Sequence, residues 1–223
     1  MILQTVVIWA FGAAGVASAA LGAGLLAGLL HALSGPDHLA AVAPLSVSGQ
    51  RATRVGLGWG VGHTLGVWGV GAFALAVRTA LPIERLSSWS ERLVGVVLIG
   101  IGLWGLVRTA RRLADSHGGE GGHRHDLPPG VKRPLWTAIG VGTLHGFAGS
   151  SHVLGVLPAL ALPSLLTSSS YLLGFGVGTI AAMAFAATVL GKLSARFSPR
   201  GHLRFLASLS LLAIVVGVYW LVA

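Results

Sequence analysis

His31-Ala32-Leu33-Ser34-Gly35-Pro36-Asp37-His38 places two imidazoles and a carboxylate inside a long apolar run. Ionisable side chains are costly in hydrocarbon, so those within a membrane span are candidates for function. Neutral imidazole with carboxylate is a ligand set for divalent first-row transition metals, whereas magnesium and calcium prefer oxygen ligands. The stretch therefore predicts a metal pathway through a membrane.

The composition is that of an integral membrane protein. Of the 223 residues, 54% are hydrophobic and only 9% are charged, and the mean hydropathy is +0.81. A soluble core of this size could not hide so much apolar surface. The chain has no cysteine, which excludes thiolate metal sites, disulfides and cysteine nucleophiles. The net charge of +9 comes from basic residues beside the apolar spans, which indicates membrane topology rather than nucleic-acid binding.

Six apolar stretches are candidates to cross a bilayer, which takes roughly 20 residues each. They cover residues 20–47, 55–77, 93–107, 135–162, 171–190 and 205–222. Residues 1–19 are also apolar and predict an extra N-terminal helix. A cleaved signal peptide is the alternative, with Ala17-Ser18-Ala19 as its cleavage site, although no lysine or arginine precedes Arg51.

The basic loops predict the orientation of the chain. The side richer in lysine and arginine is expected to be cytoplasmic, which puts the linker 110–133 inside and the C-terminus outside. The membrane expected is a cell membrane of the bacterial inner type.

The chain also matches itself. Residues 30–44 align without a gap with residues 144–158, and residues 58–62 align with residues 174–178. Chance similarity would explain the matched glycines, but it accounts poorly for two histidines and a proline in register. The matched histidine pairs are His31 with His145 and His38 with His152.

The duplication sets the predicted fold class and domain organisation. Residues 20–109 and 134–223 are expected to be two three-helix repeats, and an odd number of spans gives them opposite orientations in the membrane. The fold predicted is an all-α integral membrane protein of two inverted repeats. It has six core transmembrane helices and the extra N-terminal helix over residues 1–19.

A helix break is expected within the first span of each repeat. Proline removes a backbone donor and clashes with the preceding turn, so Gly35-Pro36 can open the first helix, and Gly149 with its neighbours can open the second. His31 and His38 lie about 10 Å apart along a straight helix. One ion could hardly reach both, because a metal-to-imidazole bond is about 2 Å long. Either the helix break brings His31 and His38 together, which we favour, or the two histidines bind the ion one after the other along its path.

Histidines and one carboxylate make up the candidate metal site. A single membrane histidine usually forms an interhelical hydrogen bond, but five within the spans, four of them in repeat motifs, favour a shared metal or proton site. Asp37 is expected to be a direct ligand or an acceptor that fixes the His38 tautomer. His63 has no partner in the second half, and the glycines beside it also suit close helix packing. The candidate ligands are His31, Asp37, His38, His63, His145 and His152.

The linker carries three further histidines. His117, His123 and His125 lie in or beside a glycine-rich tract, which suits either an accessory metal-collecting segment or a plain polar linker.

The first motif resembles a known family. His31-x5-Asp37-His38 resembles the H-x4-D-H element of the nickel/cobalt transporter family (NiCoT) and its shorter UreH-like relatives, and Gly62-His63-Thr64 is similar to the family's Gly-His-[Ser/Thr] element. The longer spacer favours the shorter relatives. The resemblance implies a multi-pass permease for Ni²⁺ or Co²⁺, with functional positions at His31, Asp37 and His38. Where the family has L-G-F-D-T-A-T-E, residues 144–152 have no carboxylate, so metal preference and transport direction stay open.

The sequence thus predicts a transporter rather than an enzyme, with Ni²⁺ or Co²⁺ as cargo and no cofactor. Alternating access would expose a His/Asp site near the bilayer midplane, and binding should weaken at low pH because protonated imidazole cannot ligate. The partners expected are the ion, the lipid bilayer, and a cytoplasmic metal chaperone or a second copy of the chain.

Two alternatives belong to other function classes. A proton-coupled anion exporter would use the histidines as a proton relay. An intramembrane hydrolase would use Ser150, Ser151 and His152, but no H-E-x-x-H is present and Asp37 is the only acidic residue in the spans.

Overall fold

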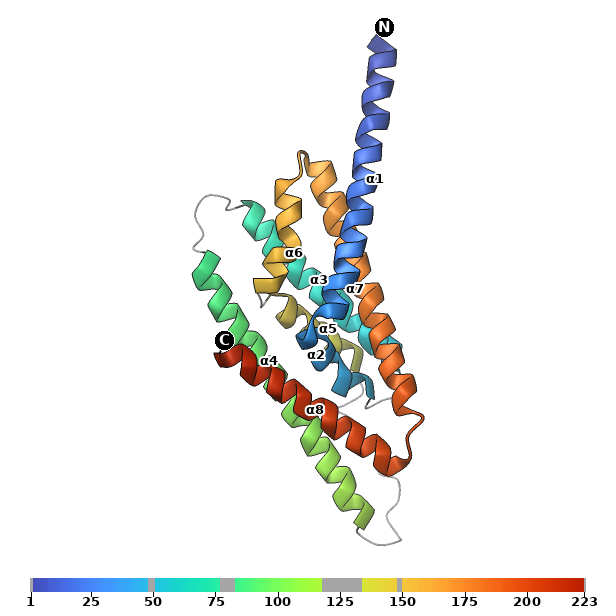
Figure 1. Cartoon of the computed structure of the whole chain (residues 1–223), viewed down its shortest axis with the longest axis vertical. Helices are drawn as coiled ribbons and strands as arrows, with labels where there is room; N and C mark the ends of the chain where they lie inside the picture. Colours follow the sequence, from blue (N-terminus) through green and yellow to red (C-terminus); the bar gives the residue numbers. More distant parts are fainter. Residues whose placement is uncertain (1, 48–50, 77–82, 118–133, 148–149, 223) are drawn as a thin grey trace.

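The computed structural model describes residues 2–47, 51–76, 83–117, 134–147 and 150–222 (Figure 1). These residues form eight helices, so the predicted all-α class is confirmed for this part of the chain. The helices are α1 (Ile2–Ser34), α2 (Pro36–Val47), α3 (Ala52–Ala76), α4 (Ile83–His117), α5 (Pro134–Phe147), α6 (Ser150–Ala161), α7 (Leu165–Ser194) and α8 (Pro199–Val222).

Four segments of these helices are long and apolar enough to cross a membrane. They are Ala14–Ser34, Val94–Ala114, Leu165–Ser194 and Pro199–Val222. Their outward surfaces suit lipid. In α8, for example, the buried residues are a single stripe at helical spacing, Leu206, Ser210, Ala213 and Gly217, and large apolar side chains elsewhere on the helix are exposed.

One helix boundary lies at Gly35, beside Pro36. Helix α1 ends at Ser34 and α2 begins at Pro36, and α2 turns away from the axis of α1 (Figure 1). Proline suits the first position of a helix, because its missing N–H would have no intrahelical partner there. The Ser34 hydroxyl donates to the Leu30 carbonyl at 2.6 Å, which engages one carbonyl of the last turn of α1. In the second half, α5 ends at Phe147 and α6 begins at Ser150, and the predicted break at Gly149 lies outside the described residues.

Helix α1 continues across the boundary expected after residue 19. Residues 2–34 form one continuous helix. No proline occurs in this stretch, and its alanine and leucine residues are strong helix formers. The apolar run is longer than one span, but length alone does not end a helix.

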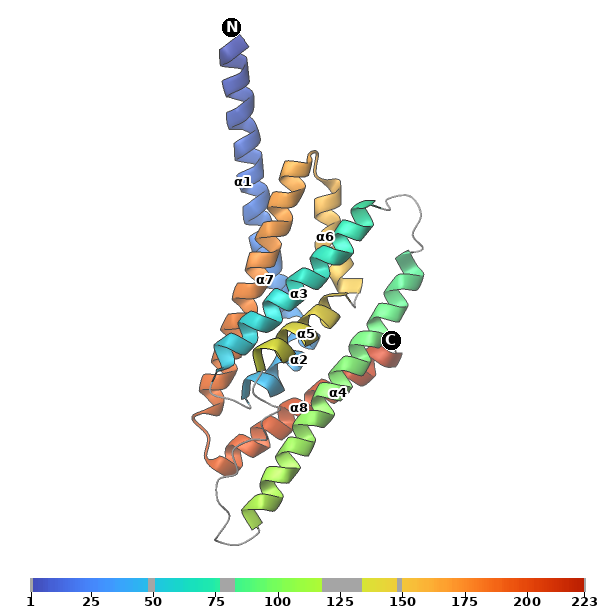
Figure 2. The same cartoon turned by 180° about the vertical axis from the view of Figure 1, so that it is seen from behind.

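The other helices pack mainly in pairs around the short α2. Helix α1 lies along α7, α3 lies along α5, and α4 lies along α8. In Figure 2, which shows the molecule from behind, α5 lies beside α3. Helix α2 contacts α3, α4, α7 and α8, and most of its side chains are buried. Because α2 begins at the helix break, Asp37 and His38 are held in the interior.

Candidate metal centre

Asp37 and His38 occupy the first turn of α2, directly after the break. Asp37 is 4% exposed and His38 is 1% exposed. The N-terminus of a helix carries partial positive charge from its unpaired N–H groups, which favours a carboxylate there. A Cβ atom on Gly35 would lie 2.2 Å from His38 Nδ1 and 2.9 Å from Asp37 Oδ1. Glycine at the break is therefore what lets these two side chains fold back against the backbone.

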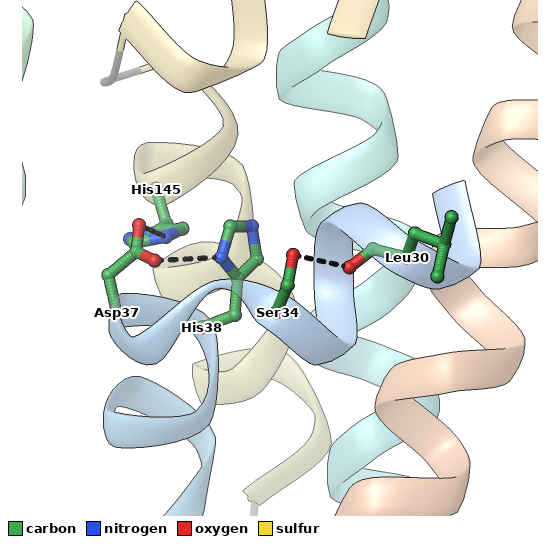
Figure 3. A network of polar contacts seen from close by, with 5 residues as sticks. All are labelled: Leu30, Ser34, Asp37, His38 and His145. Atoms are coloured by element: carbon green, nitrogen blue, oxygen red, sulfur yellow. Dashed lines mark hydrogen bonds and ion pairs between the residues drawn. The ribbon is translucent and has the colours of Figure 1, made fainter. Parts of the chain in front are cut away.

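Asp37 joins imidazoles from the two halves of the chain. Its Oδ1 lies 3.0 Å from His38 Nδ1, and its Oδ2 lies 3.2 Å from His145 Nε2 of α5 (Figure 3). An ionised carboxylate only accepts hydrogen bonds, so the two ring nitrogens are the donors. All three side chains are buried. Segments more than a hundred residues apart in the sequence thus meet at one carboxylate.

A second group of imidazoles adjoins the first. The ring centroid of His38 lies 4.6 Å from that of His31 and 4.9 Å from that of His63 of α3. The short distance between His31 and His38 is the one expected if the break brings them together. The rings of His31 and His63 are stacked at 5.8 Å. His63 is fully buried, although it has no matching histidine in the second half.

Two aromatic residues that the sequence analysis did not single out line this cluster. The indole of Trp59 stacks on His63 at 5.0 Å and lies 5.2 Å from His145. The ring of Phe175 lies 5.3 Å from His31. Both are almost completely buried. The signal that could have found them was in the repeat alignment, where Trp59 and Phe175 occupy the same position between matched glycines.

The structure brings five of the predicted ligands together, and the side chains of the others lie outside the described residues. His31, Asp37, His38, His63 and His145 come together, in two groups of three that are suited to a metal ion. His152 lies in α6, but its side chain is outside the described residues, as are those of Ser150 and Ser151. The same holds for His117 at the end of α4, and for His123 and His125 in the linker.

The donor set suits a borderline divalent ion. Imidazole nitrogens and one carboxylate fit zinc, copper, iron, nickel or cobalt better than magnesium or calcium. Within each group, the donor atoms all lie within 4.8 Å of one another. Small inward movements would bring them to the coordination distances of about 2.0–2.2 Å that such ions require.

Comparison with known proteins gives three relatives. The chain is 38% identical over 180 residues to the chloroplast protein FOR GROWTH AND FERTILITY 1 of Arabidopsis thaliana, which covers 77% of this chain and 49% of the relative. It is 35% identical over 202 residues to FOR GROWTH AND FERTILITY 2 of the same plant, covering 87% of this chain and 54% of the relative. The chain therefore spans about half the length of these plant relatives.

The third relative is a bacterial protein of similar length. The urease accessory protein UreH of Bacillus sp. (strain TB-90) is 27% identical over 208 residues, covering 89% of this chain and 88% of the relative. These similarities support a UreH-like family. No family model and no solved structure matches the chain.

Proposed function

We propose that the chain is a multi-pass membrane transporter of divalent transition-metal ions, with nickel or cobalt as the first candidates. The observation that carries the proposal is the convergence of Asp37, His38 and His145 in the interior. Buried ionisable groups in a membrane protein are costly, so a cluster of them indicates a pathway for ions or protons. The choice of nickel or cobalt rests on the resemblance to the NiCoT motifs and on the similarity to UreH.

The packing of the helices supports an inverted repeat. The first helix of each half packs along a helix of the other half, α1 along α7 and α5 along α3, and the last helices, α4 and α8, pack together. A two-fold relation between the halves would exchange α1 with α5 and α3 with α7, and would leave this pattern unchanged. Transporters of this kind bind their substrate where the broken helices of the two repeats meet.

Individual close contacts follow the same relation. A Cβ atom on Gly28 of α1 would lie 2.1 Å from the Phe175 carbonyl oxygen, and one on Gly142 of α5 would lie 2.2 Å from the Trp59 carbonyl oxygen. Gly28 aligns with Gly142, and Trp59 aligns with Phe175, when the halves are superposed by sequence. The two contacts are therefore equivalents of each other, which supports a true duplication rather than chance similarity.

The basic residues favour the predicted orientation. Arg112 of α4, Lys192 of α7 and His202 of α8 line one pocket together with residues from the end of α2 and the start of α3. These helix ends therefore gather at one end of the molecule, which we assign to the cytoplasmic side. The partners proposed with this function are the ion, the bilayer, and a cytoplasmic metal chaperone or a second copy of the chain.

The test is metal flux into proteoliposomes. Radiotracer Ni²⁺ and Co²⁺ should cross in the presence of the wild-type chain, and His38→Ala should abolish the flux because His38 belongs to both groups of donor atoms. The matched control is His202→Ala, because His202 lies outside these groups and bonds to Ser194 through Nδ1 at 2.6 Å. Absence of metal flux under any gradient would contradict the proposal. Proton flux without metal would instead favour the anion exporter, in which Asp37 and its imidazoles relay protons.

A further inference from the structure

Within the part of the chain that the structure describes, five candidate donor residues fall into two groups rather than one. His31, His38 and His63 form what we call the nitrogen site, and Asp37, His38 and His145 form what we call the mixed site. Only within each group do the donor atoms all lie within 4.8 Å of one another. The groups adjoin, since the ring centroids of His63 and His145 are 5.7 Å apart. An ion would move only a few ångström between them.

His38 cannot serve both sites at once. Its Nδ1 points at Asp37, and its Nε2 points away from Asp37 (Figure 3). While Nδ1 carries the proton that it donates to Asp37, the lone pair is on Nε2. If Nδ1 binds an ion beside Asp37, the proton must be on Nε2. Each tautomer of the neutral ring therefore serves one site, so movement of the ion between the sites requires the N–H of His38 to change from one ring nitrogen to the other.

The two sites differ in charge. The mixed site brings one carboxylate to the ion, and the nitrogen site brings only neutral imidazoles. Charge that is not neutralised is more costly in a buried, low-dielectric environment, so a divalent ion is held more tightly beside Asp37. When the ion is in the nitrogen site, Asp37 still accepts the Nδ1–H of His38, an arrangement that orients a metal-binding imidazole.

From these observations we propose that one transported ion occupies the two overlapping sites in turn, the mixed site as its resting position and the nitrogen site as its transit position. The shared ligand His38 prevents simultaneous occupation. This inference rests on the proposed transport function and deepens it, because it assigns His63 to movement of the ion and His145 to its retention.

The test uses purified, full-length protein and distinguishes binding of the ion, measured as Co²⁺ affinity, from its movement, measured as Co²⁺ flux. Equilibrium dialysis with Co²⁺ should give one ion per chain. His145→Ala should weaken binding by about tenfold or more, as loss of a metal-site residue typically does. His63→Ala should leave the affinity within about threefold of the wild type, but should lower Co²⁺ flux in proteoliposomes by about tenfold or more.

X-ray absorption of bound Co²⁺ gives a second readout. Two imidazole ligands are expected in the wild type and in His63→Ala, and three in Asp37→Asn loaded at high Co²⁺, because loss of the carboxylate leaves the nitrogen site as the better one. His63→Asn, a second substitution that keeps a polar side chain, guards against misfolding of the alanine variant. His202→Ala is the matched control and should be unchanged in every measurement.

Two outcomes would overturn the two-site proposal while leaving transport intact. One is two Co²⁺ ions bound per chain. The other is an equal loss of affinity in His63→Ala and His145→Ala, which would indicate a single site that needs all the ligands. A wild-type chain that neither binds nor transports metal would instead contradict the proposed function itself.

Discussion

Gly35 has no side chain, and this leaves room for the side chains of Asp37 and His38. It lies between α1 and α2, where Asp37 Oδ1 and His38 Nδ1 fold back to within 3 Å of where its Cβ would be. The obstacle to a side chain here is the polar pair itself rather than the path of the backbone. Glycine at this position therefore belongs to the site as much as to the helix break.

Gly35→Ala should weaken Co²⁺ binding by about tenfold or more, because the methyl group would push His38 out of both donor groups. Gly22→Ala on α1 is the matched control, since a Cβ there meets nothing within 4 Å. Both affinities can be measured by equilibrium dialysis. Wild-type affinity in Gly35→Ala would mean that His38 is not held in the position that the structure gives it.

The sequence singled out the residues of the cluster but not the residues that surround it. His31, Asp37, His38, His63 and His145 could be named in advance, because an ionisable group is conspicuous in an apolar span. Trp59 and Phe175 could not, because an aromatic residue in such a span is ordinary. The division of the five candidate donors into two groups was also out of reach, since it depends on the distances between donor atoms in the folded chain.

The short helices position the site because close-packed partners hold them. Helix α5 brings His145 to Asp37, and it can do so only because Gly142 lets it approach the backbone of α3. Helix α1 approaches α7 through the aligned Gly28.

At the level of elements, the sequence predicted the break at Gly35-Pro36, where proline has a defined effect. It did not predict that α1 continues unbroken to Ile2, because nothing in an apolar run marks where a helix must stop.

Gly142→Ala and Gly28→Ala should destabilise the protein by similar amounts, about 1–3 kcal/mol each, because each methyl group would meet a carbonyl oxygen of a neighbouring helix. Gly140→Ala on α5 and Gly22→Ala on α1 are the matched controls, because a Cβ at either position meets nothing within 4 Å. Alanine favours a helix over glycine, so the controls should be unchanged or slightly more stable. Thermal unfolding in detergent measures all four. A large loss in one half and none in the other would contradict equivalent packing of the repeats.

The whole molecule is harder to derive from the sequence than its parts. Self-alignment gave two related halves, and the basic loops gave an orientation. Neither indicated that the halves interlock, with α1 along α7 and α5 along α3. Apolar periodicity says that a helix is buried or faces lipid, but it does not name the partner. That information lies in complementary shapes, such as the glycines of α1 and α5 against the backbones of α7 and α3.

Helices of the first half pack against helices of the second half. Alternating access can therefore be tested by cross-linking two of these helices at one end of the molecule. The hydroxyl oxygens of Thr53 on α3 and Thr188 on α7 lie 2.8 Å apart, and the chain has no cysteine of its own. Thr53→Cys with Thr188→Cys should therefore form an intramolecular disulfide on oxidation, since the two sulfur atoms need to come to about 2.05 Å. Thr53→Cys with Ser169→Cys is the control, because Ser169 lies about 28 Å farther along α7, and this pair should not cross-link.

The bridge would tie the first half to the second at that end, so the site could no longer open by movement of the halves against each other. Metal flux should fall by about tenfold or more on oxidation and recover on reduction. Co²⁺ binding in detergent should be kept, because neither threonine belongs to the donor groups. A disulfide that forms fully and leaves flux unchanged would mean that the ion passes through without separation of α3 from α7 at this end. In that case, His38 and its two ligand groups would act within a fixed pathway.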